Sequence, residues 1–239
     1  MLQQKHMYTD FTIRCGRPLL VALLFATLIS PIGAADKAKD EETLKNAADV
    51  LSQMLSSNNI PSDVLERADC VLVLPDVKKF GFGVGGSGGR GPMTCRSGSD
   101  FSGQWSAPAM YSMGGASLGL QVGGSSSDFV LLIMSQKGVN AIMEGKTKLG
   151  SNATAAAGPS GATTTGMEGT DILTYAKASG LFAGASLGSA TIEPDNDANK
   201  RLYNQDVSAK EIIMTNSVRP TPAGEQFVSQ LSTKLSRHK

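Results

Sequence analysis

Apolar residues recur at helical spacing near both ends of the chain. Between Glu41 and Ser57 they lie three or four positions apart, which predicts an amphipathic helix. Pro61 follows at a position that suits the start of a second, short helix. A final amphipathic helix is predicted from Thr221 onward, where apolar residues again recur at helical spacing above a basic end.

The middle of the chain is a series of apolar runs, most of them rich in glycine. Residues 70–74 (CVLVL), stopped by Pro75, predict a buried strand, and residues 128–135 (DFVLLIMS) predict another. Of the 27 glycines, fourteen fall at 81–124 among large apolar residues, which a flexible linker would lack. This pattern predicts strands whose backbones approach closely or bulge where a side chain would obstruct them.

Further strands and short helices are expected in the second half. The small residues of 149–165 predict strands pressed against other backbone, because the segment has almost no charge. Strands are also predicted at 171–175 and 181–192, and helices at 137–145, 196–203 and 208–214. The predicted fold is α+β: a glycine-rich, curved antiparallel sheet, partly closed, with flanking short helices and terminal amphipathic helices.

The first residues have the layout of a secretory signal peptide. Lys5, Arg14 and Arg17 precede an apolar run at 19–29, and small or helix-breaking residues follow up to Ala35. The run is shorter than the roughly 20 apolar residues of a spanning helix. We therefore expect 1–35 to be a signal peptide, 36–239 to be a single domain, and the protein to be periplasmic or extracellular, peripheral to a membrane at most.

Charge argues against a nucleic-acid partner. Of the 22 Lys and Arg and the 21 Asp and Glu, the segment 1–35 holds three and one, so the remaining chain has 19 and 20 and a net charge of −1. No basic face or nucleic-acid-binding module is recognisable.

Cys70 and Cys95 flank the first glycine cluster. In an oxidising compartment the two can form a disulfide, which would contribute on the order of 3 kcal/mol. The alternative is that both are small buried hydrophobic residues.

Motifs that suggest an enzyme or a metal site are incomplete. Residues 81–86 fit GxGxxG, but no helix is predicted to open there, as a dinucleotide site requires. GxSxG occurs around Ser87, Ser117 and Ser186, yet the only histidines are His6 and His238, so a serine nucleophile lacks its usual base.

The chain also resembles a calcium-binding loop at 195–199. Lys200 stands where that loop requires glycine, and a turn in which Asp195 caps the following helix is predicted instead. We expect no catalytic residue, no metal and no cofactor.

A basic and aromatic cluster suggests a lipid-binding surface. Basic residues beside exposed aromatic ones suit an anionic head group and its acyl chain. The alternative is that the aromatic residues belong to the core and the basic ones are merely solvated. The candidate lipid-binding residues are Lys78, Lys79, Phe80, Phe82, Arg90, Arg96 and Trp105.

Several ordered blocks resemble the SYLF domain, over about residues 44–214. They are residues 68–75, KKFGFGVGGSGGRG at 78–91, WSAP at 105–108, GASLGLQVGG at 115–124, residues 128–134, LG at 149–150, AGP at 157–159, and Tyr175 followed by GLFAG at 180–184.

This resemblance implies a lipid-binding module. Eukaryotic members are described as binding phosphoinositides through an amphipathic N-terminal helix and a basic surface, and some as binding actin. The matching helix here has only Lys45 as a base on its polar side, and an exported protein is not expected to meet actin or phosphoinositides.

The function expected from the sequence is therefore non-catalytic binding of an anionic phospholipid or another amphiphile at a membrane surface. A structural or protein-interaction module of the cell envelope is the alternative.

Overall fold

The described part of the chain begins at Ile32. The computed structural model describes residues 32–57, 60–82, 84–118, 123–159, 169–178, 181–185, 187 and 190–234. The chain divides into two units, Met1–Pro31 and Ile32–Lys239, and all of these residues belong to the second. Most of the predicted signal peptide thus lies outside the described residues, as do 160–168 of the small-residue segment.

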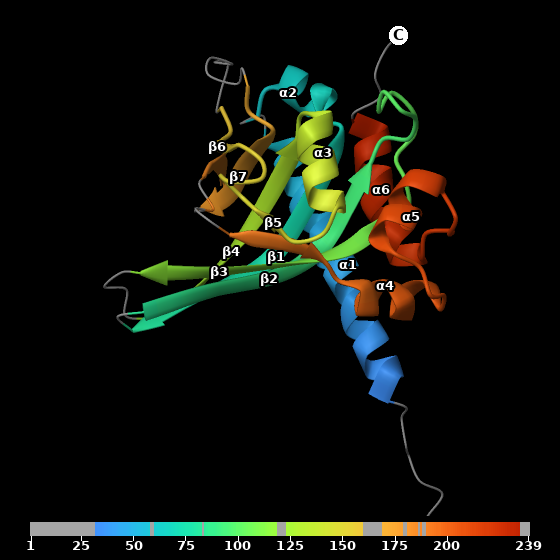
Figure 1. Ribbon diagram of the computed structural model, residues 1–239, viewed down its shortest axis with the longest axis horizontal. Coiled ribbons are helices and arrows are strands. Elements are labelled where there is room, and N and C mark those ends of the chain that lie inside the picture. The colour runs from blue at the N-terminus through green and yellow to red at the C-terminus, as the bar shows by residue number, and fades with distance from the viewer. Residues whose placement is uncertain are drawn as a thin grey trace, which may run out of the picture. The chain divides into compact units, whose positions relative to one another are not determined.

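Nine strands in the described unit form one strongly curled sheet (Figure 1). Their order is β5-β9-β3-β2-β1-β4-β7-β6, and β8 also pairs with β7. The strands are β1 (Cys70–Phe82), β2 (Val84–Cys95), β3 (Ala109–Leu118), β4 (Gly123–Ile133), β5 (Thr147–Lys148), β6 (Ala155–Ala157), β7 (Ile172–Ala178), β8 (Leu181–Gly184) and β9 (Thr191–Pro194). The predicted α+β class and curved, partly closed sheet are confirmed. One pair differs from the antiparallel expectation, because β6 and β7 run parallel.

Helices cover both faces of this sheet. They are α1 (Ile32–Ser56), α2 (Ser62–Arg67), α3 (Gln136–Met143), α4 (Asn196–Tyr203), α5 (Ala209–Thr215) and α6 (Pro222–Lys234). In Figure 1, α3 lies in front of the strands and α1 behind them. Within β1, Leu72 and Leu74 pack in the cluster that includes α3, α4 and α5, whereas Val71 and Val73 pack in the cluster that includes α1, α2 and α6. The continuous apolar run at 70–74 follows from burial on both faces.

The strand predicted to stop at Pro75 continues to Phe82. Proline cannot donate a hydrogen bond to a neighbouring strand, so a central strand accommodates it only at a bulge. The pairing of β1 with β4 shifts register between Leu74 and Val77. Within this bulge Asp76 has a φ of 53°, and its N–H donates to the Asp128 carboxylate at 3.0 Å. The carboxylate of Asp128 thus accepts a backbone N–H that is not paired with the neighbouring strand at the bulge.

Glycine allows the close backbone contacts that the sequence predicted. A Cβ atom at Gly91 of β2 would collide with the carbonyl oxygen of Val73 in β1. A Cβ atom at Gly184 would collide with the carbonyl of Gly158. At these two positions a side chain would force the backbones apart.

Helix α1 begins nine residues before the predicted start at Glu41. The charged residues before Glu41 were expected to lie outside the helix. They are helical because Asp40 is fully buried and accepts hydrogen bonds from Arg90 and Arg201. The expected cleavage position after Ala35 therefore falls in the first turn of α1.

The other predicted helices and strands are mostly present. α3, α4, α5 and α6 lie within a residue or two of their predicted positions, and β4 and β7 include most residues of the strands predicted at 128–135 and 171–175. The strand segment predicted at 181–192 holds β8 and the start of β9, which lie on different parts of the sheet.

Candidate functional site

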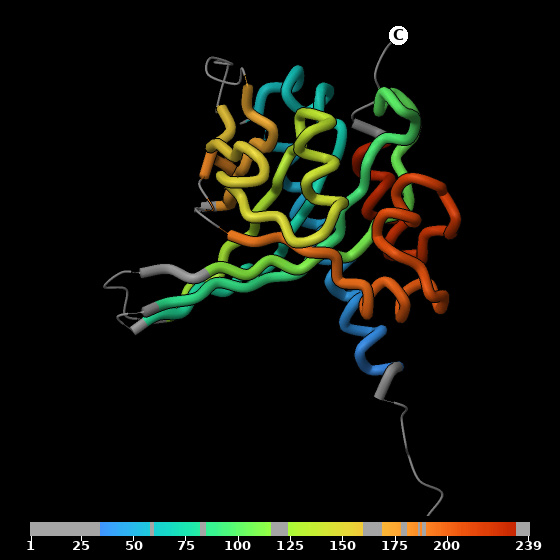
Figure 2. Tube along the Cα trace, in the orientation of Figure 1, coloured from blue at the N-terminus to red at the C-terminus, as the bar shows by residue number. Residues whose placement is uncertain are grey.

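The outer halves of four strands extend beyond their neighbours in the sheet. β7 pairs with β4 only along Phe129–Ile133, and β9 pairs with β3 only along Tyr111–Gly114. β1 and β2 nevertheless stay paired as far as Phe82 and Val84. We call residues 77–82, 84–88, 114–118 and 123–128 the outer ribbon. Figure 2 shows it extending away from the helices.

The outer ribbon carries three of the candidate lipid-binding residues in sequence. The side chain of Lys78 is 73% exposed, and Phe80 is 66% exposed. Because side chains alternate along a strand, these two residues share one face and Lys79 lies on the other. The Lys79 ammonium lies 5.2 Å from the centroid of the Phe129 ring.

Neighbouring groups hold these side chains only loosely. Lys78 pairs with Asp76 at 3.6 Å, and both side chains are exposed, so the pair contributes little to stability. The Phe80 ring lies over Gly86, where an added Cβ atom would be only 2.9 Å from the ring. Phe82 ends β1, and its side chain lies outside the described ones. The result is that Lys78 and Phe80 are exposed on one face of the strand, whereas Lys79 is half-buried on the other.

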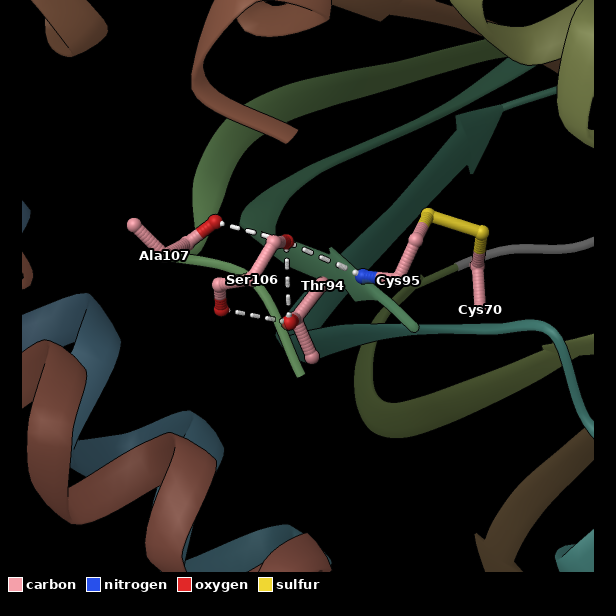
Figure 3. Close-up of a disulfide and its surroundings, with 5 residues drawn as sticks. All are labelled: Cys70, Thr94, Cys95, Ser106 and Ala107. Carbon is pink, nitrogen blue, oxygen red and sulfur yellow. Dashed lines mark hydrogen bonds between the residues drawn. A yellow bond between two sulfur atoms is a disulfide. The ribbon is translucent and has the colours of Figure 1, made fainter. Parts of the chain in front are cut away.

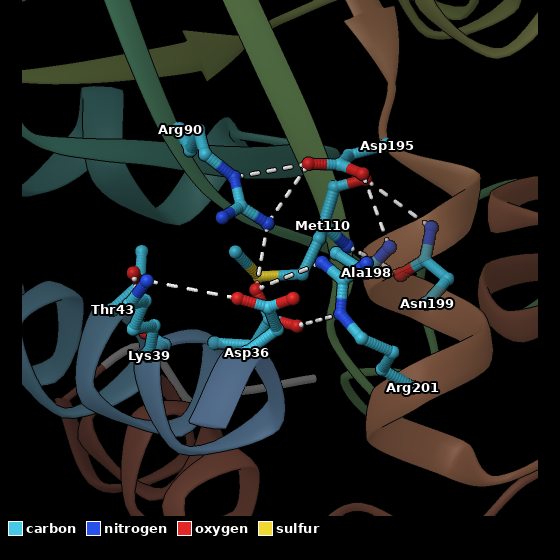
Figure 4. A network of polar contacts seen from close by, with 10 residues as sticks. Asp36, Lys39, Thr43, Arg90, Met110, Asp195, Ala198, Asn199 and Arg201 are labelled. Carbon is cyan, nitrogen blue, oxygen red and sulfur yellow. Dashed lines mark hydrogen bonds and ion pairs between the residues drawn. The ribbon is translucent and has the colours of Figure 1, made fainter. Parts of the chain in front are cut away.

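Arg90 does not belong to this surface, contrary to the sequence-based prediction. Its guanidinium donates to Asp40 at 2.7 Å and to Asp195 at 2.9 Å (Figure 4). Arg201 donates to Asp40 from its Nε at 2.9 Å, and this hydrogen bond raises the pKa of Arg201. The two arginines and two aspartates thus neutralise one another where α1, β2 and α4 meet.

This network of charges could not be predicted from local sequence, because its members lie far apart in the chain. Only one contact was foreseeable. Asp195 accepts from the N–H of Ala198 and caps α4, as predicted. In the same helix the buried Asn199 side chain accepts from the N–H of Met110 at 2.7 Å and so fixes α4 against β3.

Arg96 and Trp105 are also not surface residues. Arg96 is 5% exposed and Trp105 is 9% exposed. The Arg96 guanidinium lies 4.5 Å from the centroid of the Trp105 ring, and the two residues form an isolated bridge. Their cation–π contact closes the base of the loop that joins β2 to β3. The interpretation of Trp105 as a core aromatic residue is therefore the correct one.

Cys70 and Cys95 form a disulfide in the structure (Figure 3). They are directly paired positions of β1 and β2, and both are fully buried. Beside them the N–H of Cys95 donates to the Ser106 hydroxyl at 3.3 Å, and the Thr94 hydroxyl donates to the Ser106 carbonyl at 2.8 Å. The bond closes the inner end of the β1–β2 hairpin, opposite the outer ribbon.

The serines of the GxSxG motifs do not sit on a strand-to-helix turn where the structure describes them. Ser87 lies within β2 and Ser117 within β3, whereas a nucleophile elbow needs a sharp turn into a helix. The GxGxxG residues lead from β1 into another strand. Across the described residues, no group of three or more His, Cys, Asp or Glu side chains is arranged to hold a metal.

Helix α1, for which the resemblance implied a lipid-binding role, is packed against the sheet. The apolar side of α1, including Leu44, Leu51 and Met54, is buried. In this conformation the apolar side is not available to lipid. Within the part of the chain that the structure describes, no helix has the length and apolar character needed to cross a membrane.

Comparison with known proteins identifies relatives of the chain. Residues 114–234 match the Ysc84 family, described as "Las17-binding protein actin regulator". Two similar proteins from Saccharomyces cerevisiae are LAS seventeen-binding protein 3, 31% identical over 209 residues, and Protein YSC84, 32% identical over 213 residues. The human SH3 domain-containing YSC84-like protein 1 is 30% identical over 198 residues.

These matches cover 82%, 81% and 81% of this chain but 44%, 44% and 57% of the relatives. The chain thus spans about half the length of the curated relatives it matches. No solved structure was found to match it significantly. Because the family match spans half of the chain and the relatives align with most of it, the chain belongs to the Ysc84 (SYLF) family.

Proposed function

We propose that this chain is a non-catalytic binding domain whose outer ribbon docks on an anionic lipid surface. The observation that carries the proposal is the exposed Phe80 ring, which directly follows Lys78 and Lys79 in the strand. An aromatic ring can enter the boundary between head groups and acyl chains while neighbouring ammonium groups contact the head groups.

The expected affinity of one outer ribbon is low. Each lysine near an anionic surface contributes about 1 kcal/mol. Burial of a phenylalanine ring adds about 1.5–3 kcal/mol when it is complete. The sum, on the order of 4 kcal/mol, corresponds to millimolar binding. Contact would therefore be reversible and sensitive to salt.

Vesicle sedimentation tests this proposal. Residues 36–239 should pellet with phosphatidylglycerol vesicles at low salt and stay in the supernatant with phosphatidylcholine vesicles. Lys78→Ala with Lys79→Ala should abolish most of the pelleting, and Phe80→Ala should weaken it. The control changes Lys146 and Lys148, two exposed lysines outside the ribbon, to Ala and should pellet normally. Equal loss in the control, or no pelleting of the wild type, contradicts the proposal.

We also propose that the protein is exported. The signal-like pattern of 1–35 and the buried Cys70–Cys95 disulfide support this, since disulfides persist in oxidising compartments. Expression of the full chain in a Gram-negative bacterium should give a periplasmic product whose intact mass is that of residues 36–239. An unprocessed product in the cytoplasm would contradict export.

Protein binding is the second candidate function. It is favoured by the name of one relative, LAS seventeen-binding protein 3, and by the family description, "Las17-binding protein actin regulator". The chain matches under half of the LAS seventeen-binding protein 3 sequence. Protein binding by this chain is therefore tested with purified components. Co-sedimentation of residues 36–239 with actin filaments, in the absence of lipid, would favour this candidate over the first.

A further inference from the structure

A groove lies among the helices, and the residues that line it are distant in sequence from those of the outer ribbon. It has a volume of about 470 Å³ and is formed by the start of α1, the end of α4 and the connection that leads into α6. Its lining includes Lys37, Tyr203, Val218, Arg219, Pro220 and Pro222. None of these residues belongs to the outer ribbon, so the groove is a separate candidate site.

The floor of the groove is apolar. Tyr203 and Val218 are each 8% exposed. The Tyr203 hydroxyl donates to the carbonyl of Pro108, which leaves the ring as the surface that faces the groove. Burial, with a smaller effect of Glu41, raises the pKa of Tyr203, so the ring stays neutral at physiological pH. A ligand that uses this floor must present an apolar group.

The rim of the groove has an excess of positive charge. Eight of the sixteen described Lys and Arg side chains form an ion pair with a carboxylate, and Lys37 and Arg219 form none within the described residues. The one acidic lining residue, Glu41, accepts a hydrogen bond from the Thr221 hydroxyl at 3.1 Å. Two cations therefore remain available to a ligand carboxylate.

We propose that this groove binds an extended acidic peptide segment of a partner protein. Its carboxylates would meet Lys37 and Arg219, and an apolar side chain between them would lie on Tyr203 and Val218. The exposed polar side chains of Gln205 and Ser217, which also line the groove, can hydrogen-bond a peptide backbone. This complementarity of charge and polarity favours a peptide over a purely apolar ligand.

Fluorescence anisotropy with three labelled model peptides tests the proposal. The first alternates glutamate and leucine, the second replaces glutamate by lysine, and the third replaces leucine by serine. Only the first should bind residues 36–239, and its affinity should fall as salt is raised. Failure of the first peptide to bind, or equal binding of either control peptide, overturns the proposal.

Substitutions then locate the binding. Lys37→Gln combined with Arg219→Gln should lower the affinity of the glutamate–leucine peptide by roughly tenfold, since each exposed charge contributes up to about a fivefold effect. The matched control, Lys45→Gln with Lys210→Gln, removes two exposed lysines outside the groove and should leave affinity unchanged. Equal effects of the two pairs would overturn the proposal, as would uptake of dodecanoate in the groove without any peptide binding.

The two proposed sites fail independently in these experiments. The Lys37 and Arg219 variant should still pellet with phosphatidylglycerol vesicles, and the Lys78 and Lys79 variant should still bind the glutamate–leucine peptide. Loss of peptide binding in the second variant would place the peptide on the outer ribbon and overturn the groove proposal.

Discussion

The Asp171 carboxylate holds three segments together through hydrogen bonds. It accepts from the Ser135 hydroxyl at 2.6 Å, from Lys137 at 3.1 Å and from the Thr154 hydroxyl and N–H at 2.8 and 2.9 Å. Burial alone would raise the pKa of Asp171, but the hydrogen bonds from Ser135, Thr154 and Lys137 outweigh it and lower the pKa well below its usual value of 3.8. The start of α3, the segment before β6 and the start of β7 thus depend on one ionised side chain.

We predict that Asp171→Asn lowers the free energy of unfolding at pH 7 by about 1–3 kcal/mol, because buried donors lose their charged acceptor. The depressed pKa means that the folded state binds fewer protons than the unfolded state below about pH 4. The contribution of Asp171 is therefore complete above pH 4 and declines as pH falls further. Urea unfolding at pH 7 and pH 3 measures both effects.

The matched control is Asp206→Asn. Asp206 pairs with Lys200 at 2.9 Å, but its side chain is 87% exposed, so its removal should change stability by under about 0.5 kcal/mol. A similar loss in both variants would contradict the role given to Asp171.

At the scale of elements, the periodicity of the sequence predicts most helices and the longest buried strands. α4 coincides with its predicted range because Asp195 caps its start and its apolar residues recur regularly. β1 was predicted too short because Pro75 was expected to end it. The strand continues because the N–H of Asp76, beside Pro75, donates to the carboxylate of Asp128, fifty-two residues away. Local sequence carries no information about such a contact.

The candidate lipid-binding residues likewise include some that local sequence could group together and others that it could not place. Lys78, Lys79 and Phe80 are neighbours in one strand, so their grouping could be proposed from the sequence. Arg90 and Trp105 are also a basic and an aromatic residue, but Arg90 is paired with Asp40, and Trp105 is buried against Arg96. Nothing local distinguishes an arginine that meets lipid from one that neutralises Asp40.

We predict that the attachment of α1 depends on Asp40. Asp40→Asn leaves Arg201 without its carboxylate partner and Arg90 with only Asp195, and should lower the free energy of unfolding by about 1–3 kcal/mol. The value is moderate because the side chains of Arg90 and Arg201 are 37% and 29% exposed. Hydrogen exchange should become faster in the first half of α1 before it does so in β1.

Asp36→Asn is the control for this prediction. Asp36 pairs with Lys39 on the exposed surface of the same helix, so exchange in α1 should stay close to that of the wild type. Uniformly faster exchange across the sheet in the Asp40 variant would show instead that the four charges stabilise the whole unit.

At the scale of the whole unit, the sheet has one end that is held and one that is free. At the inner end, β1 and β2 lie between two layers of helices and are joined by the disulfide. At the outer end the same strands continue past β7 and β9, where β2 and β4 have glycine or serine at most positions. A rigid base can therefore position Phe80 and its lysines without helices around them.

Reduction of the disulfide should test how far this base depends on a covalent bond. Cys70 and Cys95 are 25 residues apart, and a loop of this size restricts the unfolded chain by about 3 kcal/mol in the entropic description. We predict that dithiothreitol lowers the free energy of unfolding by about that amount, measured by urea denaturation. The Cys70→Ala and Cys95→Ala double variant should be equally destabilised and should not respond to the reductant.

The denatured, unreduced wild-type protein, as residues 36–239, should contain no free thiol, and detection of two free thiols would show that the bond does not form. Because the outer ribbon lies at the other end of these strands, vesicle binding by the folded, reduced protein should match that of the oxidised protein, whereas its loss on reduction would show that the disulfide also positions Phe80.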